Sequence, residues 1–314
     1  MLQGFLPINK PVGMRSTACV EQIKRILGRG VKTGHGGTLD STACGVLVLL
    51  LGGATRLSSF VMQTPKTYRA VIKLGSETTT CDYSGEPIIF GDAGGVTGED
   101  IDGALPSFLG WRMQVPPDIS AVRVNGRRAH NISRSGGVPD IKPRPVFIES
   151  IRRVGNFSAA PEDCKVELLI RCGKGTYIRS LARDLGRKLG CRAHIASLKR
   201  EAAGPFTESN ALLLEPDFDS REKILSAILP IDFLGGFLPL YKVCGEGERA
   251  LAAGKEIPFS RAARETYGDS CPDSIILAKG KSLISVGALK ASRVTMIKPQ
   301  INIEKINSFT ENSR

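Results

Sequence analysis

The sequence lacks the cysteine and histidine patterns that hold metal ions. Its eight cysteines include no C-x-x-C pair, and its three histidines are scattered along 314 residues. Zinc sites draw on closely spaced thiol and imidazole ligands, so we expect no metal site.

Nucleotide-binding and hydrolase motifs are also missing. The stretch 34–37, GHGG, begins like a dinucleotide-binding loop, but Leu39 occupies the third glycine position of G-x-G-x-x-G. Neither G-x-x-x-x-G-K-[ST] nor G-x-S-x-G occurs. We therefore expect no phosphotransfer, dinucleotide or serine-hydrolase chemistry, and no cofactor.

Long apolar segments are absent as well. The longest runs are far shorter than the ~20 residues of a membrane-spanning helix. The start, MLQGFLPINKP, lacks the charged-then-apolar pattern of a signal peptide. These features predict a cytoplasmic protein with reduced cysteines and no membrane partner.

The sequence has an excess of positive charge. Forty-three Lys and Arg residues against 31 Asp and Glu give a formal net charge of +12 and a pI of about 9.4. Residues 112–153 hold nine basic against three acidic residues, and residues 171–200 hold nine against one. A solvated basic face would explain these clusters, but their density favours a phosphate backbone as partner.

Hydrophobic patterns predict a mixed α and β fold. Four segments have the length, branching or alternation of strands: residues 4–9, 46–51, 68–74 and 166–172. Periodicity alone leaves a short helix open for 46–51. Ser16 and Thr176 are each expected to cap a helix with a regular apolar stripe.

Composition divides the chain into a large domain over 1–238 and a small one over 239–300. Within the first, the segment of about 112–150 has few core residues and an Asn125-Gly126 turn, which is typical of a surface excursion. After residue 239, a short helix and strands punctuated by glycine and serine predict a β-rich module. Residues 301–314 are polar and are expected to form a tail.

Asp40 is the carboxylate that these patterns single out. It lies in GHGGTLDSTACG, residues 34–45, among glycines and hydroxyls and just before the apolar run 46–51. A lone Asp in such a loop most often caps a turn, because its short side chain accepts backbone N–H bonds. The residues around Asp40, however, form a longer motif.

The stretch 35–47, HGGTLDSTACGVL, resembles the signature of the TruB-type tRNA pseudouridine(55) synthases. Further blocks of that family occur in the same order along residues 4–235: KPVG at 10–13, KTYRA at 66–70, PPDISA at 116–121, GTYIRSLARDLG at 175–186 and AH at 193–194. Several positions depart from the family pattern. Ser41-Thr42 replace the usual Pro-Leu, Gly36 and Cys44 replace residues that are commonly Thr, and Arg123 and His130 replace Lys and Tyr.

The resemblance implies a fold and a reaction. The fold is α+β: a pseudouridine-synthase-like catalytic domain with a mixed, mainly antiparallel sheet, flanking helices and an RNA-gripping excursion, followed by a small β-rich PUA-like RNA-binding domain. The reaction is the cofactor-free isomerisation of uridine 55 in the tRNA T-arm, on a base flipped out of the RNA. The protein would be a monomer with no obligatory protein partner.

The resemblance also implies site residues. Asp40 would be the nucleophile, since a carboxylate can attack or stabilise an oxocarbenium-like sugar. Arg179 would anchor it bidentately, and Tyr68 would stack on the uracil and help remove the C5 proton. Substrate contacts would come from His35, which fills the space of the flipped base, and from Tyr177, Leu198, Lys10, Arg123, Arg127 and Arg134.

Two alternatives remain open at this point. A tRNA-binding or tRNA-folding module without catalysis would need the basic clusters but not Asp40, Tyr68 and Arg179 together. A guide-RNA-dependent pseudouridylase of the same fold is the other alternative. The compact second domain and the lack of long lysine-rich tails favour an enzyme that acts alone.

Overall fold

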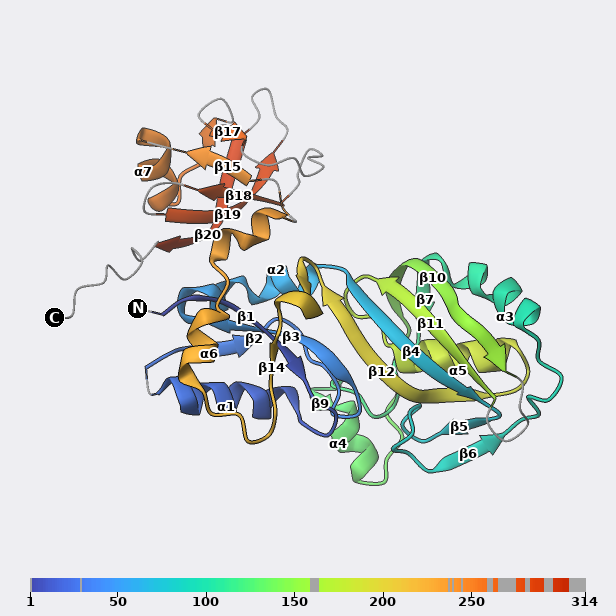
Figure 1. The fold of residues 1–314 in the computed structure, drawn as a ribbon. Helices are drawn as coiled ribbons and strands as arrows, with labels where there is room; N and C mark the ends of the chain where they lie inside the picture. Colours follow the sequence, from blue (N-terminus) through green and yellow to red (C-terminus); the bar gives the residue numbers. More distant parts are fainter. Residues whose placement is uncertain are drawn as a thin grey trace.

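Two β-sheets organise the chain in the computed structural model (Figure 1). The structure describes residues 2–28, 30–158, 164–236, 238, 240–243, 245–258, 262–264, 275–279, 283–290 and 296–304. The larger sheet has ten strands and the smaller, C-terminal sheet has six.

The large sheet is mixed and mainly antiparallel, as predicted. Its main path runs β14-β1-β3-β12-β4-β11-β10-β7, with β2 paired to β3 and β13 paired to β12. The pairs β1–β14 and β3–β12 are parallel. The strands are β1 (Gly4–Lys10), β2 (Thr33–His35), β3 (Cys44–Leu51), β4 (Lys66–Leu74), β7 (Gly110–Gln114), β10 (Arg144–Ser158), β11 (Lys165–Cys172), β12 (Ala193–Ala203), β13 (Phe206–Thr207) and β14 (Leu212–Leu213).

The β1–β3 end of the sheet is buried on both faces. One face of β3, with Leu47 and Leu49, packs with α1 (Ser16–Leu27) and α6 (Arg221–Ser226). The other face, with Val46 and Val48, packs with α2 (Ser58–Gln63) and β13. The apolar run 46–51 is therefore a strand covered on both sides, which excludes the short helix.

The β4–β11 end is covered on one face only. Ile72 and Leu168 pack against α5 (Ile178–Lys188), which lies along this end of the sheet in Figure 1. On the opposite face, the partly exposed Arg69 makes ion pairs with Glu167 and Glu201. One covered face and one solvated face produce the alternating pattern that predicted these strands.

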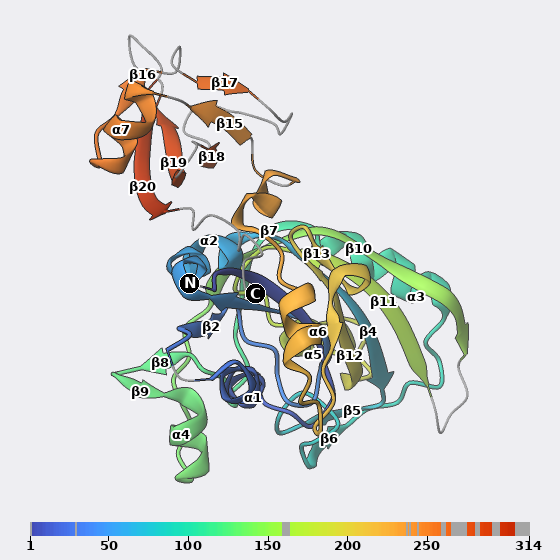
Figure 2. The same ribbon diagram turned by 60° about the vertical axis from the view of Figure 1, so that its left-hand side comes forward.

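The excursion is an arm outside the large sheet. It carries a hairpin of β8 (Arg123–Val124) and β9 (Arg127–Arg128), followed by α4 (Ala129–Arg134), and projects from the sheet in Figure 2. Asn125 and Gly126 both have positive φ, 49° and 81°, as an Asn-Gly hairpin turn requires. Strands β7 and β10 occupy the two ends of the expected range of about 112–150. The arm therefore comprises residues 115–143.

Three smaller elements complete the first part of the chain. β5 (Ser76–Thr78) and β6 (Pro87–Phe90) form a hairpin, and α3 (Gly98–Ala104) follows it. The turn that joins β5 to β6 carries residues 79–86, and this turn becomes part of the candidate active site.

The C-terminal sheet follows the order β16-β20-β19-β18-β15-β17, beside α7 (Glu246–Ala252). Its strands are β15 (Leu240–Val243), β16 (Ile257–Pro258), β17 (Ala262–Arg264), β18 (Ile275–Lys279), β19 (Leu283–Lys290) and β20 (Met296–Glu304). Because β20 reaches Glu304, the first four residues of the expected tail belong to the sheet, and 305–314 lie outside the described residues. Val286 is fully buried in an apolar cluster with Phe5 and Leu57, so the two sheets share a contact.

Candidate active site

Asp40 lies in the loop between β2 and β3, with its carboxylate turned outward. Leu39 and Ala43, on either side, are buried in the core beneath the sheet. The Asp40 side chain is 42% exposed. In the described part of the chain no backbone N–H bonds to this carboxylate; its contact is with Arg179. The turn-cap reading of Asp40 is therefore wrong.

Arg179 brings a buried positive charge to Asp40. Its Nε lies 2.9 Å from Asp40 Oδ2, and its side chain is 7% exposed. Its Nη1 donates to the carbonyls of Thr80 (2.9 Å) and Ile119 (3.2 Å). The Nε–H is not directed along a hydrogen bond to any acceptor among the described residues. The predicted partnership is present, but it is not a bidentate hydrogen bond: Nε faces Asp40, and Nη1 bonds the two carbonyls.

A second carboxylate, Asp82, lies near the same nitrogen of Arg179. Its Oδ2 is 3.9 Å from Arg179 Nε, and its side chain is 4% exposed. Its Oδ1 accepts hydrogen bonds from the Ser84 hydroxyl (2.6 Å), the Ser84 N–H (3.0 Å) and the Thr80 hydroxyl (2.7 Å). Burial raises the pKa of Asp82, but the Ser84 and Thr80 bonds and the Arg179 charge outweigh it and leave the pKa lowered. Asp82 therefore contributes negative charge that helps to hold Arg179.

The backbone of the Asp40 loop is tied down on both sides of the carboxylate. The Leu39 N–H donates to Ser16 Oγ (2.9 Å), and Ser16 Oγ donates to the Leu39 carbonyl (2.8 Å). On the other side, the Gly13 N–H donates to the Ser41 carbonyl (2.7 Å). The prediction that Ser16 caps α1 is wrong: its hydroxyl bonds the backbone of the Asp40 loop, and Arg15 takes the N-cap position.

Lys10 stabilises the turn that bonds to the Asp40 loop. It is fully buried, and its Nζ donates to the carbonyls of Pro11 and Met14, both at 2.8 Å. Burial lowers the pKa of Lys10. Its ammonium shapes the 10–14 turn, whose Gly13 N–H bonds the Ser41 carbonyl, so Lys10 supports the Asp40 loop, as its place near the motif suggests; its contact with substrate stays a prediction.

Tyr68 and Leu198 share an apolar cluster with Leu39 and Ala43, the residues that flank Asp40. They lie on the adjacent strands β4 and β12, and Leu198, 8% exposed, belongs to the core cluster against which Tyr68 packs. Tyr68 lies directly opposite Arg200 in the strand register. Burial raises the pKa of Tyr68, and the positive charge of Arg200 opposes this increase.

Arg200 is a buried cation held by the Asp40 loop and by β3. It is 2% exposed and donates to the carbonyls of Val46 (2.6 Å), Thr38 (3.2 Å) and Gly37 (3.4 Å). The backbones of β3 and β12 also approach each other closely at Arg200. Only glycine fits at position 45, because a Cβ at Gly45 (φ +104°) would lie 2.3 Å from the Arg200 carbonyl oxygen.

Tyr177 and His35 border the site. Tyr177 precedes α5, and its backbone N–H and carbonyl bond to the Gln114 side chain at 2.9 and 3.1 Å. Burial raises the pKa of Tyr177, and the Asp40 charge adds to this. Burial lowers the pKa of His35, so its ring is neutral near pH 7, and its buried Nδ1 has no partner in the described part of the chain. Thr176 does not cap α5 as predicted; its hydroxyl donates to the Gly173 carbonyl.

Most of the predicted site residues meet in one place, and three do not. Arg179 contacts Asp40, the Asp40 charge acts on Tyr68 and Tyr177, and Leu198 shares an apolar cluster with Leu39 and Tyr68. Arg123, Arg127 and Arg134 lie exposed on the arm. Sequence reasoning missed Ser16, Asp82 and Arg200. The signal for Arg200 was available, since it occupies an inward position of an alternating strand two residues after Leu198, where a charge is unusual.

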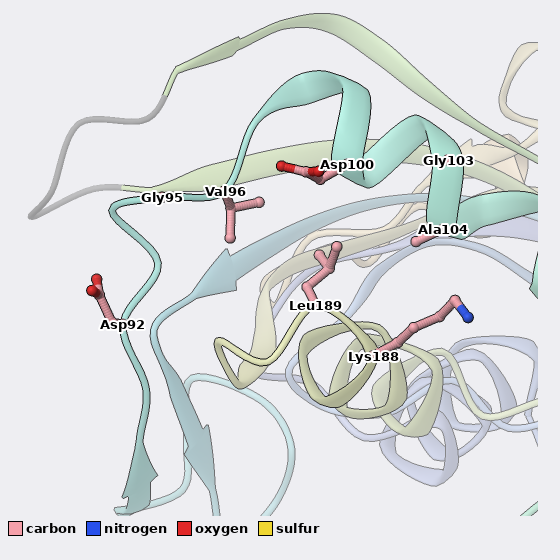
Figure 3. Close-up of a pocket in the computed structure, with 8 residues that line it drawn as sticks. All are labelled: Asp92, Gly95, Val96, Asp100, Gly103, Ala104, Lys188 and Leu189. Atoms are coloured by element: carbon pink, nitrogen blue, oxygen red, sulfur yellow. The ribbon is translucent and has the colours of Figure 1, made fainter.

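A cavity elsewhere in the molecule lacks converging chemical groups. It has a volume of about 580 Å³ and lies between α3 and the end of α5 (Figure 3). Asp100 is engaged in the cap of α3 and Asp92 bonds the Gly94 N–H. Lys188 lies at the opposite end from Asp92 in Figure 3. Across the described ranges, no cluster of three or more His, Cys, Asp or Glu residues could hold a metal ion, and no helix could span a membrane.

Comparison with known proteins identifies the family. The model for the TruB family pseudouridylate synthase N-terminal domain matches residues 24–178, and the one for the tRNA pseudouridylate synthase B C-terminal domain matches residues 179–233. A Cereibacter sphaeroides protein named tRNA pseudouridine synthase B is 39% identical over 255 residues, covering 81% of this chain and 83% of that protein. The chain belongs to the TruB family of pseudouridylate synthases. The predicted family and the predicted enzyme class, an isomerase, are confirmed.

Other TruB family relatives match over greater lengths. A Caulobacter vibrioides protein of the same name is 33% identical across 95% of this chain and 96% of that protein. Among solved structures, one titled as a Cbf5-Nop10-Gar1 complex aligns with a TM-score of 0.70, covering 96% of this chain and 84% of that chain at 23% identity. This likeness concerns the fold, which agrees with the predicted architecture. The two TruB family ranges end before β15, so neither reaches the C-terminal sheet.

Proposed function

We propose that this chain converts uridine 55 of the tRNA T-loop to pseudouridine, with Asp40 as the nucleophile. We further propose that it acts in the cytoplasm as a monomer, without a guide RNA, a cofactor or an obligatory protein partner. The names of its relatives support tRNA as the substrate. The observation that carries the catalytic assignment is the partly exposed Asp40 carboxylate held 2.9 Å from the buried Arg179.

The reaction rearranges bonds within one nucleotide. The N1–C1′ bond breaks, the uracil turns, a C5–C1′ bond forms, and the proton on C5 is replaced by one on N1, so no atoms or electrons are gained. An ionised Asp40 can add to the sugar or to the base during this exchange. In both cases the carboxylate must stay in one position while the base turns. Ser16, Gly13 and Arg179 provide that restraint.

The surroundings of Asp40 suit a flipped uracil. Tyr68, Tyr177 and Leu198 offer flat or apolar surfaces on which a base can stack. His35 is neutral, and an unprotonated imidazole can enter a base stack without bringing a charge with it. The exposed arginines of the arm would contact backbone phosphates, which position the RNA without reading its sequence.

The test is turnover by the purified protein alone. A T-arm stem-loop RNA with tritium at C5 of the target uridine should release tritium to water without any guide RNA. A matched stem-loop with the label only in uridines outside the loop should release none. Binding of the stem-loop without release would instead support the non-catalytic module, and release that needs an added guide RNA would support the guide-dependent alternative.

A further inference from the structure

Thr42 is placed beside the Arg179 network, two residues after the proposed nucleophile. Its hydroxyl donates a hydrogen bond of 3.1 Å to Asp82 Oδ2. The other oxygen, Oδ1, accepts the three bonds from Thr80 and Ser84. Oδ2 is thus the oxygen that faces both Thr42 and Arg179 Nε.

These contacts close a ring through the site. Asp40 Oδ2 contacts Arg179 Nε at 2.9 Å, the same nitrogen lies 3.9 Å from Asp82 Oδ2, and Asp82 Oδ2 accepts from Thr42. The chain from Thr42 back to Asp40 completes the circuit. The Asp40 carboxylate is therefore restrained both by its own loop and by Arg179. The loop and Arg179 are also linked to each other through Thr42 and Asp82.

The ring uses one of the two residues, Ser41 and Thr42, that replace the usual Pro-Leu after the aspartate. Ser41 is exposed, and its backbone carbonyl, which any residue would supply, accepts the bond from Gly13. Thr42 is partly buried, and its contact requires a hydroxyl. An aliphatic side chain here would leave Asp82 Oδ2 without this donor in a buried place.

We propose that Thr42 is a positioning residue for the isomerisation, acting through Asp82 and Arg179 to hold the Asp40 carboxylate in place. The inference rests on the proposed function, because it assigns Thr42 a part in that reaction. Thr42 does not touch the substrate in this account. Its loss should therefore slow the chemical step and leave RNA affinity unchanged.

The experiment compares Thr42→Val, which keeps the shape and removes the hydroxyl, with Thr42→Ser, which keeps the hydroxyl. Ser41→Ala is the matched control in the same loop. We expect the single-turnover rate of C5-tritium release to fall by about 10-fold in Thr42→Val, since a hydrogen bond to a charged group is lost. Thr42→Ser should restore most of the rate, Ser41→Ala should equal wild type, and stem-loop affinity should stay within about twofold in all three.

A double-mutant cycle separates positioning from general damage. In the Asp82→Asn background, Thr42→Val should cause a much smaller further loss of rate, because its partner has been altered. Full additivity of the two losses would overturn the proposal. So would a wild-type rate in Thr42→Val, or a Thr42→Ser variant as slow as Thr42→Val. An inactive wild-type protein would count against the proposed function itself, whereas an active one with an unaffected Thr42→Val variant would count against this inference alone.

Discussion

At the scale of single residues, the site is built from buried cations held by backbone carbonyls. Arg179 bonds two carbonyls, Arg200 bonds three and Lys10 bonds two. A carbonyl fixes a cation by hydrogen bonding but does not neutralise its charge. The positive charge therefore remains available to Asp40 and to an anionic substrate.

Asp82 gives this arrangement a pH dependence. Its pKa is lowered in the folded protein from an ordinary value of 3.8. Folding thus favours the ionised form, so the stabilisation is present above pH ~4 and is lost as the pH falls through the lowered value. We predict that the unfolding free energy of the wild type, measured by urea titration, falls more steeply below pH ~4 than that of Asp82→Asn.

The control for this prediction is Asp219→Asn, which changes an exposed carboxylate. Its stability profile should run parallel to that of the wild type, because other carboxylates titrate equally in both proteins. Parallel profiles for wild type and Asp82→Asn would show that ionised Asp82 does not stabilise the fold.

At the scale of elements, the strands could be predicted from the sequence, and the side chains that anchor the Asp40 loop could not. The alternation of apolar and polar residues predicted β4 and β11, because one face of each strand is solvated. The run of branched apolar residues 46–51 predicted β3. Ser16 was assigned to the wrong partner, since a serine before a helix can cap it or bond elsewhere, and Leu39 is 23 residues away. Asp82 was missed because a carboxylate among hydroxyls in TTTCDYS is typical of an ordinary turn. Tertiary partners at long sequence separation decided both cases.

The arm is the element that we expect to hold the RNA backbone. Replacing Arg127, Arg128 and Arg134 with Gln should weaken stem-loop binding, and each lost phosphate contact should reduce the slope of log affinity against log salt by about one. The single-turnover rate at saturating RNA should fall less than the affinity. Binding titrations over a range of salt concentrations measure the slope directly.

Three exposed cations on α1 and α6, Lys24, Arg25 and Lys223, provide a control of equal charge. Their replacement with Gln should change net charge by the same amount and leave most of the slope in place. Equal slopes for the two triple variants would assign the arm arginines to a solvated face.

At the scale of the whole molecule, the C-terminal sheet is separate in topology but shares an apolar contact with the large sheet. Val286 is fully buried in a cluster with Phe5 and Leu57, and Ile301 packs against the same cluster. Burying such a side chain contributes about 1.5–3 kcal/mol. The proposed domain boundary near residue 239 therefore divides two sheets that stabilise each other.

Removal of residues 240–314 tests this boundary. The shortened chain should remain folded with a lower unfolding midpoint, because the Val286 contact is lost. Turnover of the stem-loop should persist, and affinity for full-length tRNA should fall more than affinity for the stem-loop. An insoluble product would contradict the boundary, whereas equal losses for the two RNAs would contradict an RNA-binding role for the second sheet.

The Asp40→Asn variant decides whether Asp40 is the nucleophile. Asparagine keeps the size of the side chain and removes the charge, and it serves nearly as well as Asp at a turn or cap. The measurement is C5-tritium release from the stem-loop in single turnover, with RNA affinity and thermal midpoint determined on the same preparation. We expect no detectable product, with affinity and midpoint close to wild type. Substantial product from Asp40→Asn would contradict that assignment.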